Sequence, residues 1–291
     1  MDWLNALLQG TLLGGYYALL ATGLSLVFGV MRLVNLANGD LAVLAAYVAL
    51  VVVRATGINP FVAILPVIVV LALAGYLLQR LILNRTVERG PLPPLIVTFG
   101  LAVIIQNALL VVFTANSQGL DAGAIENASI DLGNGLAVGL YPVLTLIVAV
   151  VTLGGLSLFL GRTRLGRALR AASDDREAAS MVGIDNDHLY GVAMAIAMGT
   201  LALAGIFLGI RTTFAPSDGP VSLIFAFETV ILGGLGSLWG TLVGGIVLGV
   251  AQAFGNQVNP AFQLLAGHLV FLAILLFRPQ GLFPRAGVRQ V

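Results

Sequence analysis

Five acidic residues lie in one short stretch near the middle of the chain, the densest group of side chains that could do chemistry. They are Asp174, Asp175, Glu177, Asp185 and Asp187. Carboxylates in such a group could hold Mg²⁺ together with a substrate phosphate, as in a membrane enzyme that acts on a lipid diphosphate. Such enzymes need two separated acidic motifs facing one cavity, whereas these acids form a single cluster. The sequence therefore disfavours a metal-dependent enzyme, and we expect no metal site.

The same stretch predicts a short capped helix. Asp174 can cap its N-terminus, while Glu177, three residues on, returns the bond as a capping box. Gly183 is placed to end the helix in the left-handed conformation. The small and apolar residues between them are Ala178, Ala179, Met181 and Val182. A short helix with such a face, lying between basic segments outside the membrane, requires a protein partner.

Two more acids lie within or beside apolar runs, where a carboxylate is costly and functional by default. Glu228 either lines a solute pathway, meeting an ammonium group or a polar gate, or lies near the outer interface beside Arg211 or water. Asp40 is either a pathway residue or, together with Asn38, the N-cap of the following helix, which is the favoured alternative. Asn35 and Asn38 could hydrogen-bond across helices and fix a break, or line a pore.

The elements that position these groups are almost wholly apolar. Apolar residues make up 59% of the 291-residue chain and charged residues 9%, against about a quarter charged in soluble domains. Apolar runs of roughly 20 residues recur, long enough to cross the hydrocarbon core of a bilayer. Such runs must be helical, because lipid cannot satisfy backbone hydrogen bonds. We predict an all-α integral membrane protein.

About eight membrane segments are predicted, within a range of roughly seven to nine, in a single transmembrane domain spanning residues 1–291. The second segment is short for a crossing, and the seventh is too long for one simple crossing. Both are expected to be broken or re-entrant, which is tolerated only inside protein or beside a watery cavity. The segments are Leu4–Val30, Leu41–Val53, Phe61–Leu83, Leu95–Thr114, Leu140–Leu160, Leu189–Ile210, Val221–Phe254 and Ala261–Phe277.

Lysine and cysteine are both absent, and all 14 basic residues are arginines. An ATP-binding phosphate loop needs a lysine that reaches the β and γ phosphates. The missing cysteines exclude disulfides, thiol nucleophiles and cysteine metal ligands. His188 and His268 lie far apart, and each is expected either to have a hydrogen-bond partner within the protein or to lie at the membrane interface. We therefore expect no enzyme activity and no cofactor, and the net charge of +1 gives no sign of nucleic-acid binding.

Arginine is concentrated in three regions, which are expected to be cytoplasmic because cytoplasmic loops carry an excess of Lys and Arg. The three groups are Arg80, Arg85 and Arg89; Arg162, Arg164, Arg167, Arg170 and Arg176; and Arg278, Arg285 and Arg289. The loops Asp121–Asp131 and Thr212–Pro220 would then face outside. The side of the N-terminus stays open, because it depends on whether the first two segments cross twice.

Glycine is patterned as well as plentiful. Gly236, Gly240 and Gly244 recur every four residues, a spacing that lets helix backbones approach closely in lipid. We expect helix packing rather than ligand binding there. Two polar interruptions of glycine-rich apolar runs, residues 35–40 and 233–237, resemble the paired breaks of an inverted repeat.

Three stretches together carry a family resemblance. The sequence Glu177-Ala178-Ala179, followed by Gly183, resembles the "EAA" coupling loop of ABC importer permeases. The wider string GRALRAASDDREAASMVGID, residues 166–185, is similar to the version in branched-chain amino acid ABC transporter permeases. Segments 8–39 and 226–283 also fit that family, in order and at its spacing. The chain departs from the family at Leu36, Asn38 and Glu228, where Phe, His and an apolar residue are usual.

The resemblance implies a permease subunit in a bacterial inner (plasma) membrane, in contact with lipid. Its implied partners are a second permease, identical or paralogous, two cytoplasmic ABC ATPases and an extracytoplasmic solute-binding protein. The coupling loop would cover about residues 161–188 and, like the C-terminus, would be cytoplasmic. Asp174, Glu177, Ala178, Ala179 and Gly183 would couple to the ATPase. The implied solute is leucine, isoleucine or valine, although relatives handle other amino acids, amides or urea. A stand-alone secondary transporter or channel is the alternative, but it leaves the coupling loop unexplained.

Overall fold

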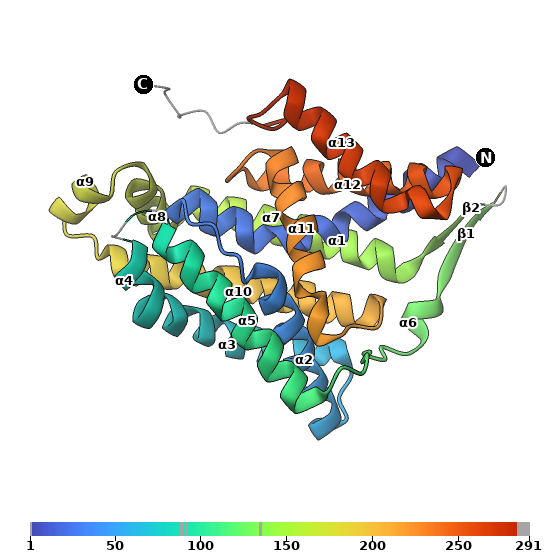
Figure 1. Cartoon of the computed structure of the whole chain (residues 1–291), viewed down its shortest axis with the longest axis horizontal. Helices are drawn as coiled ribbons and strands as arrows, with labels where there is room; N and C mark the ends of the chain where they lie inside the picture. Colours follow the sequence, from blue (N-terminus) through green and yellow to red (C-terminus); the bar gives the residue numbers. More distant parts are fainter. Residues whose placement is uncertain (1, 88–89, 91, 134–135, 284–291) are drawn as a thin grey trace.

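The computed structural model describes residues 2–87, 90, 92–133 and 136–283 (Figure 1). Arg89, Arg285 and Arg289, three of the arginines used to predict orientation, lie outside the described residues. The first half contains α1 (Asp2–Met31), α2 (Asn38–Thr56), α3 (Pro60–Leu78), a π-helical turn (Gln79–Leu83), α4 (Asn84–Val87), α5 (Leu92–Phe113) and α6 (Ala124–Asn127).

A short antiparallel hairpin follows, formed by β1 (Ser129–Gly133) and β2 (Leu136–Gly139). The second half is again helical. Its elements are α7 (Leu140–Arg162), α8 (Arg164–Asp174), α9 (Arg176–Met181), α10 (Asn186–Arg211), a 3-10 turn (Pro216–Asp218), α11 (Gly219–Gly233), α12 (Leu238–Val258), a second 3-10 turn (Pro260–Phe262) and α13 (Gln263–Phe277).

Among the described residues, eight helical segments are long and apolar enough to cross a membrane. The prediction of an all-α polytopic membrane protein with about eight segments is confirmed. The long seventh segment is divided, as expected, because the helix stops at Gly233 and restarts at Leu238. Gly234 and Gly236 in the intervening turn have φ values of 100° and 78°, which only glycine adopts without strain.

The helices run between two ends of the molecule, here called the α9 end and the hairpin end (Figure 1). The N-terminal part of α1 lies at the hairpin end, since Gln9 donates a hydrogen bond to the Ala137 carbonyl. The far end of α1 lies at the α9 end, where the Ser173 hydroxyl bonds the Gly29 carbonyl. Both α4 and α8 also lie at the α9 end (Figure 1). Two of the three predicted arginine-rich regions thus share one side.

Helices α1 and α10 form the centre of the bundle, and α3, α5, α7 and α13 surround it. The two central helices are mostly buried, whereas α13 buries only Gly267 among its residues. Large apolar side chains such as Leu65, Val111 and Leu276 are more than two-thirds exposed. An apolar outer surface is what a lipid environment requires, since side chains there face hydrocarbon rather than water.

The chain turns back into the body of the molecule after α1. Asn38, the first residue of α2, bonds the Leu20 carbonyl over 3.4 Å, and Leu20 lies 11 residues before the end of α1. At 1.5 Å per residue, α2 therefore starts about 16 Å inside the bundle. It ends at the hairpin end, where Arg54 bonds Gln118. The second segment is thus re-entrant, and we call α2 a half-helix because it starts inside the bundle, although its 19 residues are long enough to cross a membrane.

A matching half-helix follows α10. The loop Thr212–Pro220, expected to lie outside the membrane, re-enters the bundle: Phe214 is 1% exposed and packs on Tyr47 of α2. It leads to Gly219, the first residue of α11, which lies directly against Gly39 and the carboxyl group of Asp40. The sequence missed this re-entry because the loop has neither a long apolar run nor a glycine repeat.

An approximate two-fold relation connects these elements. Helices α1, α2, α3 and α5 correspond to α10, α11, α12 and α13, which run in opposite directions: α1 packs on α12 as α10 packs on α3, and α2 packs on α5 as α11 packs on α13. The contacts repeat in detail. Gly245 lies against the Gly14 carbonyl and Ala18, while Gly75 lies against the Met194 carbonyl and Met198. Met194 and Met198 stand 180 positions after Gly14 and Ala18.

The inverted repeat is therefore present, but its paired breaks differ from the expectation. The break at residues 35–40 corresponds to residues 212–219, not to residues 233–237, because the N-termini of α2 and α11 are the ends that meet. Gly240 and Gly244 of α12 lie against the backbone of α11. Gly236, expected to belong to the same packing face, instead lies in the turn before α12.

Candidate functional site

Helix α8 is a surface helix held on one face. The Thr163 side chain caps it by accepting a hydrogen bond from the Gly166 amide over 2.9 Å. Gly166 itself lies against the backbone of α7, where a β-carbon would sit 2.5 Å from the Leu160 Cα atom. Leu169 is fully buried, while Arg164, Arg167 and Arg170 are exposed. A single apolar face against α1, α7 and α10 fixes α8 at the end of the bundle.

Helix α9 begins one residue later than the sequence analysis expected. Its N-cap is Asp175, whose carboxylate accepts the Ala178 amide over 3.0 Å. Asp174, expected to be the cap, is instead the last residue of α8. Glu177 is therefore the second helical residue and does not form the predicted capping box. Its charge still lies in the first turn, where it interacts favourably with the helix dipole.

Gly183 ends α9, as its sequence position indicated. It has a φ of 86°, its amide bonds the Ser180 carbonyl, and the Ile184 amide bonds the Ala179 carbonyl. This pair of bonds is a Schellman motif, which satisfies the last carbonyls of the helix. Both ends of a six-residue helix are thus closed by side-chain or backbone partners, and the short helix keeps a defined shape.

The outer face of α9 is apolar and exposed. Met181 and Val182 are 81% and 76% exposed, and Glu177 and Ala178 lie on the same open side. Ala179, expected on that face, turns inward and is 4% exposed. Two large apolar side chains at such exposure, on a helix lying beyond the ends of the membrane segments, form a surface suited to a protein partner.

A second polar group lies at the centre of the bundle, where α2 and α11 meet. Asp40 is 2% exposed and accepts a hydrogen bond from Gln106 of α5 over 2.9 Å. Neither Asp40 nor Asn38 caps α2, whose N-cap is Ala37 without a side-chain bond, so the favoured cap assignment is wrong. The N-termini of two helices converge on the Asp40 carboxylate, and their dipoles both stabilise its negative charge.

Asn35 and Asn38 hold the break in place. The Asn35 side chain accepts the Ala37 amide over 3.0 Å, while Asn38 bonds α1 through the Leu20 carbonyl. Each is 2% exposed. In this structure their side chains form hydrogen bonds with backbone groups at a non-helical break, where a membrane offers the backbone no water.

Glu228 of α11 has a partner that the sequence analysis did not anticipate. Its Oε1 atom lies 2.5 Å from Nδ1 of His268 in α13, and the His268 ring stacks on Phe225. Glu228 is 5% exposed, and its second oxygen lacks a hydrogen-bond partner among the described residues. Arg211 instead lies over the Tyr16 ring, so it is not the partner of Glu228.

Gln106 was not named from the sequence, and His268 was named there without a partner. Each belongs to a largely apolar helix, and that was the available signal, since a polar side chain in a membrane segment usually has a partner inside the protein. The described residues contain no group of three or more His, Cys, Asp or Glu side chains that could hold a metal ion.

Comparison with known proteins decides the family. Residues 6–277 match the family described as "Branched-chain amino acid transport system / permease component". The chain belongs to this permease family. No solved structure is a significant match to the permease.

Curated relatives extend over the full length of the permease. The high-affinity branched-chain amino acid transport system permease protein BraD of Pseudomonas aeruginosa is 28% identical, over 99% of this chain and 98% of its own. The LivH permease protein of the corresponding Escherichia coli system is 26% identical over the same shares. The LivM permease protein of the Salmonella typhimurium system is 28% identical over 92% of this chain and 68% of its own. The permease thus resembles two different permease proteins of one type of transport system.

Proposed function

We propose that this chain is the membrane-spanning subunit of an ATP-driven importer of branched-chain amino acids. The observation that carries the proposal is α9, an exposed and doubly capped helix beyond the membrane segments, in a chain of the permease family. Without lysine the chain has no phosphate-binding loop for ATP, so the energy must enter through another protein. The relatives' names supply the solute class.

The α9 end is the cytoplasmic side in this proposal, and each of two ATPases docks on one permease. Glu177, Ala178, Met181 and Val182 provide the contact surface, while Asp175 and Gly183 hold its shape. Ala179 anchors the helix from its inner side. The arginines of α8 surround this surface, as the excess of positive charge on cytoplasmic loops predicts. Both the C-terminus and residues 161–188 are then cytoplasmic.

The translocation pathway runs, in this proposal, along the side of α11 that faces a second permease. Exposed and half-buried residues of α11, Val221, Ile224 and Phe225, lie on that side, between the flanking helices α5 and α13 (Figure 1). A paralogue is the expected second subunit, because relatives include both LivH and LivM proteins. Asp40, Asn35 and Asn38 support the pathway wall from behind, and Glu228 with His268 forms its polar element.

The hairpin end then faces outward, towards an extracytoplasmic solute-binding protein, and the protein spans a bacterial inner membrane. The permease performs no covalent chemistry. It exchanges between states with different access, and nucleotide binding on the ATPases shifts their populations.

The energy source separates this proposal from a stand-alone secondary transporter. Proteoliposomes containing this chain, its partner permease and the two ATPases should take up radiolabelled leucine only under two conditions. ATP must be present on the side of the membrane that carries the ATPases, and a binding protein must be present on the opposite side. Uptake driven by a proton or sodium gradient without ATP would contradict the importer assignment. Uptake of amides or urea in place of leucine would keep the importer but change its solute.

A further inference from the structure

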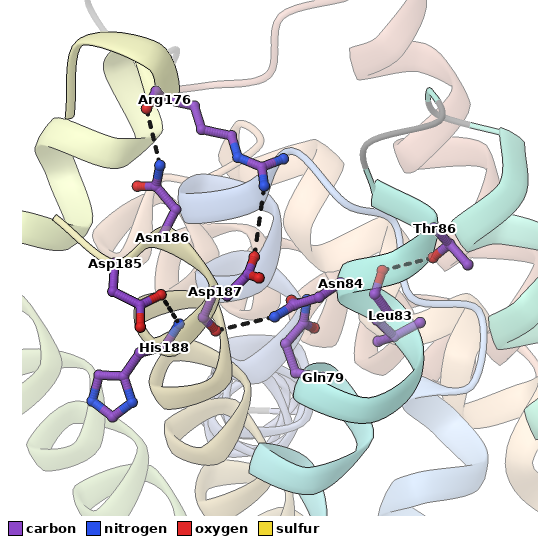
Figure 2. A network of polar contacts seen from close by, with 9 residues as sticks. All are labelled: Gln79, Leu83, Asn84, Thr86, Arg176, Asp185, Asn186, Asp187 and His188. Atoms are coloured by element: carbon purple, nitrogen blue, oxygen red, sulfur yellow. Dashed lines mark hydrogen bonds and ion pairs between the residues drawn. The ribbon is translucent and has the colours of Figure 1, made fainter. Parts of the chain in front are cut away.

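A chain of polar contacts, most buried at Gln79 and Asn84, connects α9 with the C-terminal end of α3 (Figure 2). It begins at Arg176, the first residue of α9, whose carbonyl accepts a hydrogen bond from Asn186 over 2.9 Å. The Arg176 guanidinium pairs with Asp187 at 3.6 Å and lies over the Tyr190 ring. Three side chains of the first turns of α10 therefore hold the start of α9, and α9 cannot move without that turn.

The chain of contacts continues from α10 into α4. The Asn84 side chain donates a hydrogen bond to the Asp187 carbonyl over 3.2 Å and accepts one from Gln79 over 2.8 Å. Asn84 is 8% exposed and Gln79 is fully buried. Both bonds belong to one amide group, so Asn84 links the first turn of α10 directly with the π-helical turn that separates α3 from α4.

The π-helical turn is the unusual element here. It spans Gln79–Leu83, and its closing bond runs from the Asn84 amide to the Gln79 carbonyl, five residues back. A π turn carries one extra residue, and single π turns inside α-helices occur often at functional sites. Removing the extra residue from the turn would rotate α4 by one residue relative to α3. A shift of this extra residue along the helix is therefore a discrete step, which would change the direction of the α4 side chains relative to α3.

Contacts on either side of the turn confine any rearrangement to it. On the bundle side, Gly75 of α3 lies against the backbone of α10 at Met194, and the Tyr76 ring lies against Gly191. On the α9 side, Asn84 holds the first turn of α10. Helix α3 therefore contacts α10 before the turn, and after the turn Asn84 contacts the first turn of α10, which in turn holds α9.

Two buried acceptors in this network are available to further hydrogen-bond donors. The Oε1 atom of Gln79 and the Oδ1 atom of Asn186 are buried and lack hydrogen-bond partners among the described residues. Buried acceptors are rarely left unpaired, and both belong to side chains that already use their amide nitrogen in this network. An arrangement of the turn that supplied donors to these oxygens would be stabilised by the added hydrogen bonds.

We propose that Asn84 and Gln79 transmit the displacement of α9 to α3, and that the π-helical turn is the element that rearranges. The inference rests on the proposed function, since it assumes that an ATPase moves α9. It assigns a role to two residues outside both the docking surface and the pathway. They are positioning residues, which act on solute access through α3 and α10.

The test uses the whole transporter, with this chain, its partner permease, both ATPases and binding protein, in proteoliposomes. In one reaction, radiolabelled leucine uptake and ATP hydrolysis are measured together. Asn84→Leu keeps the branched shape of the side chain but removes both hydrogen bonds. We expect ATP hydrolysis within about twofold of wild type and leucine moved per ATP reduced roughly tenfold, because coupling free energies between sites are of that size. Gln79→Leu, which breaks the link at its other end, should have the same effect.

Thr86→Val is the matched control, because among the described residues the Thr86 hydroxyl bonds the nearby Leu83 carbonyl and no residue of α9 or α10. It should leave the ratio of leucine to ATP unchanged. An unchanged ratio in Asn84→Leu and Gln79→Leu would overturn the proposal. So would failure of both variants to assemble while Thr86→Val assembles, since the network would then serve folding alone. Failure of the importer assignment is distinguishable, because wild-type uptake would itself not depend on ATP.

Discussion

Gly39 of α2 and Gly219 of α11 face each other at the point where two half-helices meet, and neither position has room for a side-chain carbon. A β-carbon on Gly39 would meet the Gly219 carbonyl oxygen and lie 2.6 Å from the Leu223 amide, and one on Gly219 would collide with the Asp40 carboxylate. The two residues stand 180 positions apart, at corresponding places in the inverted repeat. This contact joins the two halves of the molecule at mid-depth.

Substituting either glycine should therefore destabilise the bundle. Gly39→Ala or Gly219→Ala forces the half-helices apart, and overpacking of this kind costs about 1–3 kcal/mol. Thermal unfolding of the purified permease in detergent measures the effect. Gly100→Ala in α5 is the control, because a β-carbon there meets nothing within 4 Å, and it should be neutral or slightly stabilising. Equal unfolding temperatures for all three variants would contradict the described junction.

The pair formed by Glu228 and His268 predicts non-additive effects. His268→Leu removes the only described partner of a buried carboxylate. We expect the free energy of unfolding to fall by about 2 kcal/mol, the low end for such truncations, because His268 is half exposed. Adding Glu228→Gln should recover part of that loss, because the amide carries no charge to desolvate. A double-mutant cycle from unfolding temperatures measures the coupling. Strict additivity of the two substitutions would show that the pair does not form.

The cap of α9 can be tested with two adjacent acids. Asp175→Ala removes the side chain that accepts the Ala178 amide, and loss of such a cap costs about 1 kcal/mol of helix stability. Since α9 is short, the ATPase should then bind the permease several-fold more weakly in a pull-down or by interferometry. Asp174→Ala, at the end of α8, should bind as wild type. The opposite ranking would favour Asp174 as the cap.

These two acids also show how far the sequence could predict the site. Composition and segment length were sufficient for the helical membrane fold, because lipid leaves the backbone no alternative. The short helix and its terminal Gly183 were also predictable, since a left-handed end strongly favours glycine. Which of Asp174 and Asp175 caps α9 was not, because either fits the motif and the choice depends on where α8 ends in three dimensions.

Contacts between distant segments could not be predicted at all. Glu228 and His268 are 40 positions apart on different helices, and Asp40 and Gln106 are 66 apart. In each pair one residue was recognised from its apolar surroundings, whereas the partner depends on how the half-helices pack. The re-entry after α10 was missed for the same reason, because Phe214 is buried by its contact with α2 rather than by a local apolar run.

Charge reversal at Glu177 tests most directly the claim that energy enters the permease through α9. In proteoliposomes containing the full transporter, Glu177→Lys should reduce leucine uptake and stimulated ATP hydrolysis together, by roughly tenfold or more, while membrane insertion is unchanged. Charge reversal at Asp121, an exposed acid at the hairpin end, should leave the stimulation of the ATPases intact. If Glu177→Lys transports leucine as fast as wild type, with normal ATP hydrolysis, α9 is not the site of coupling.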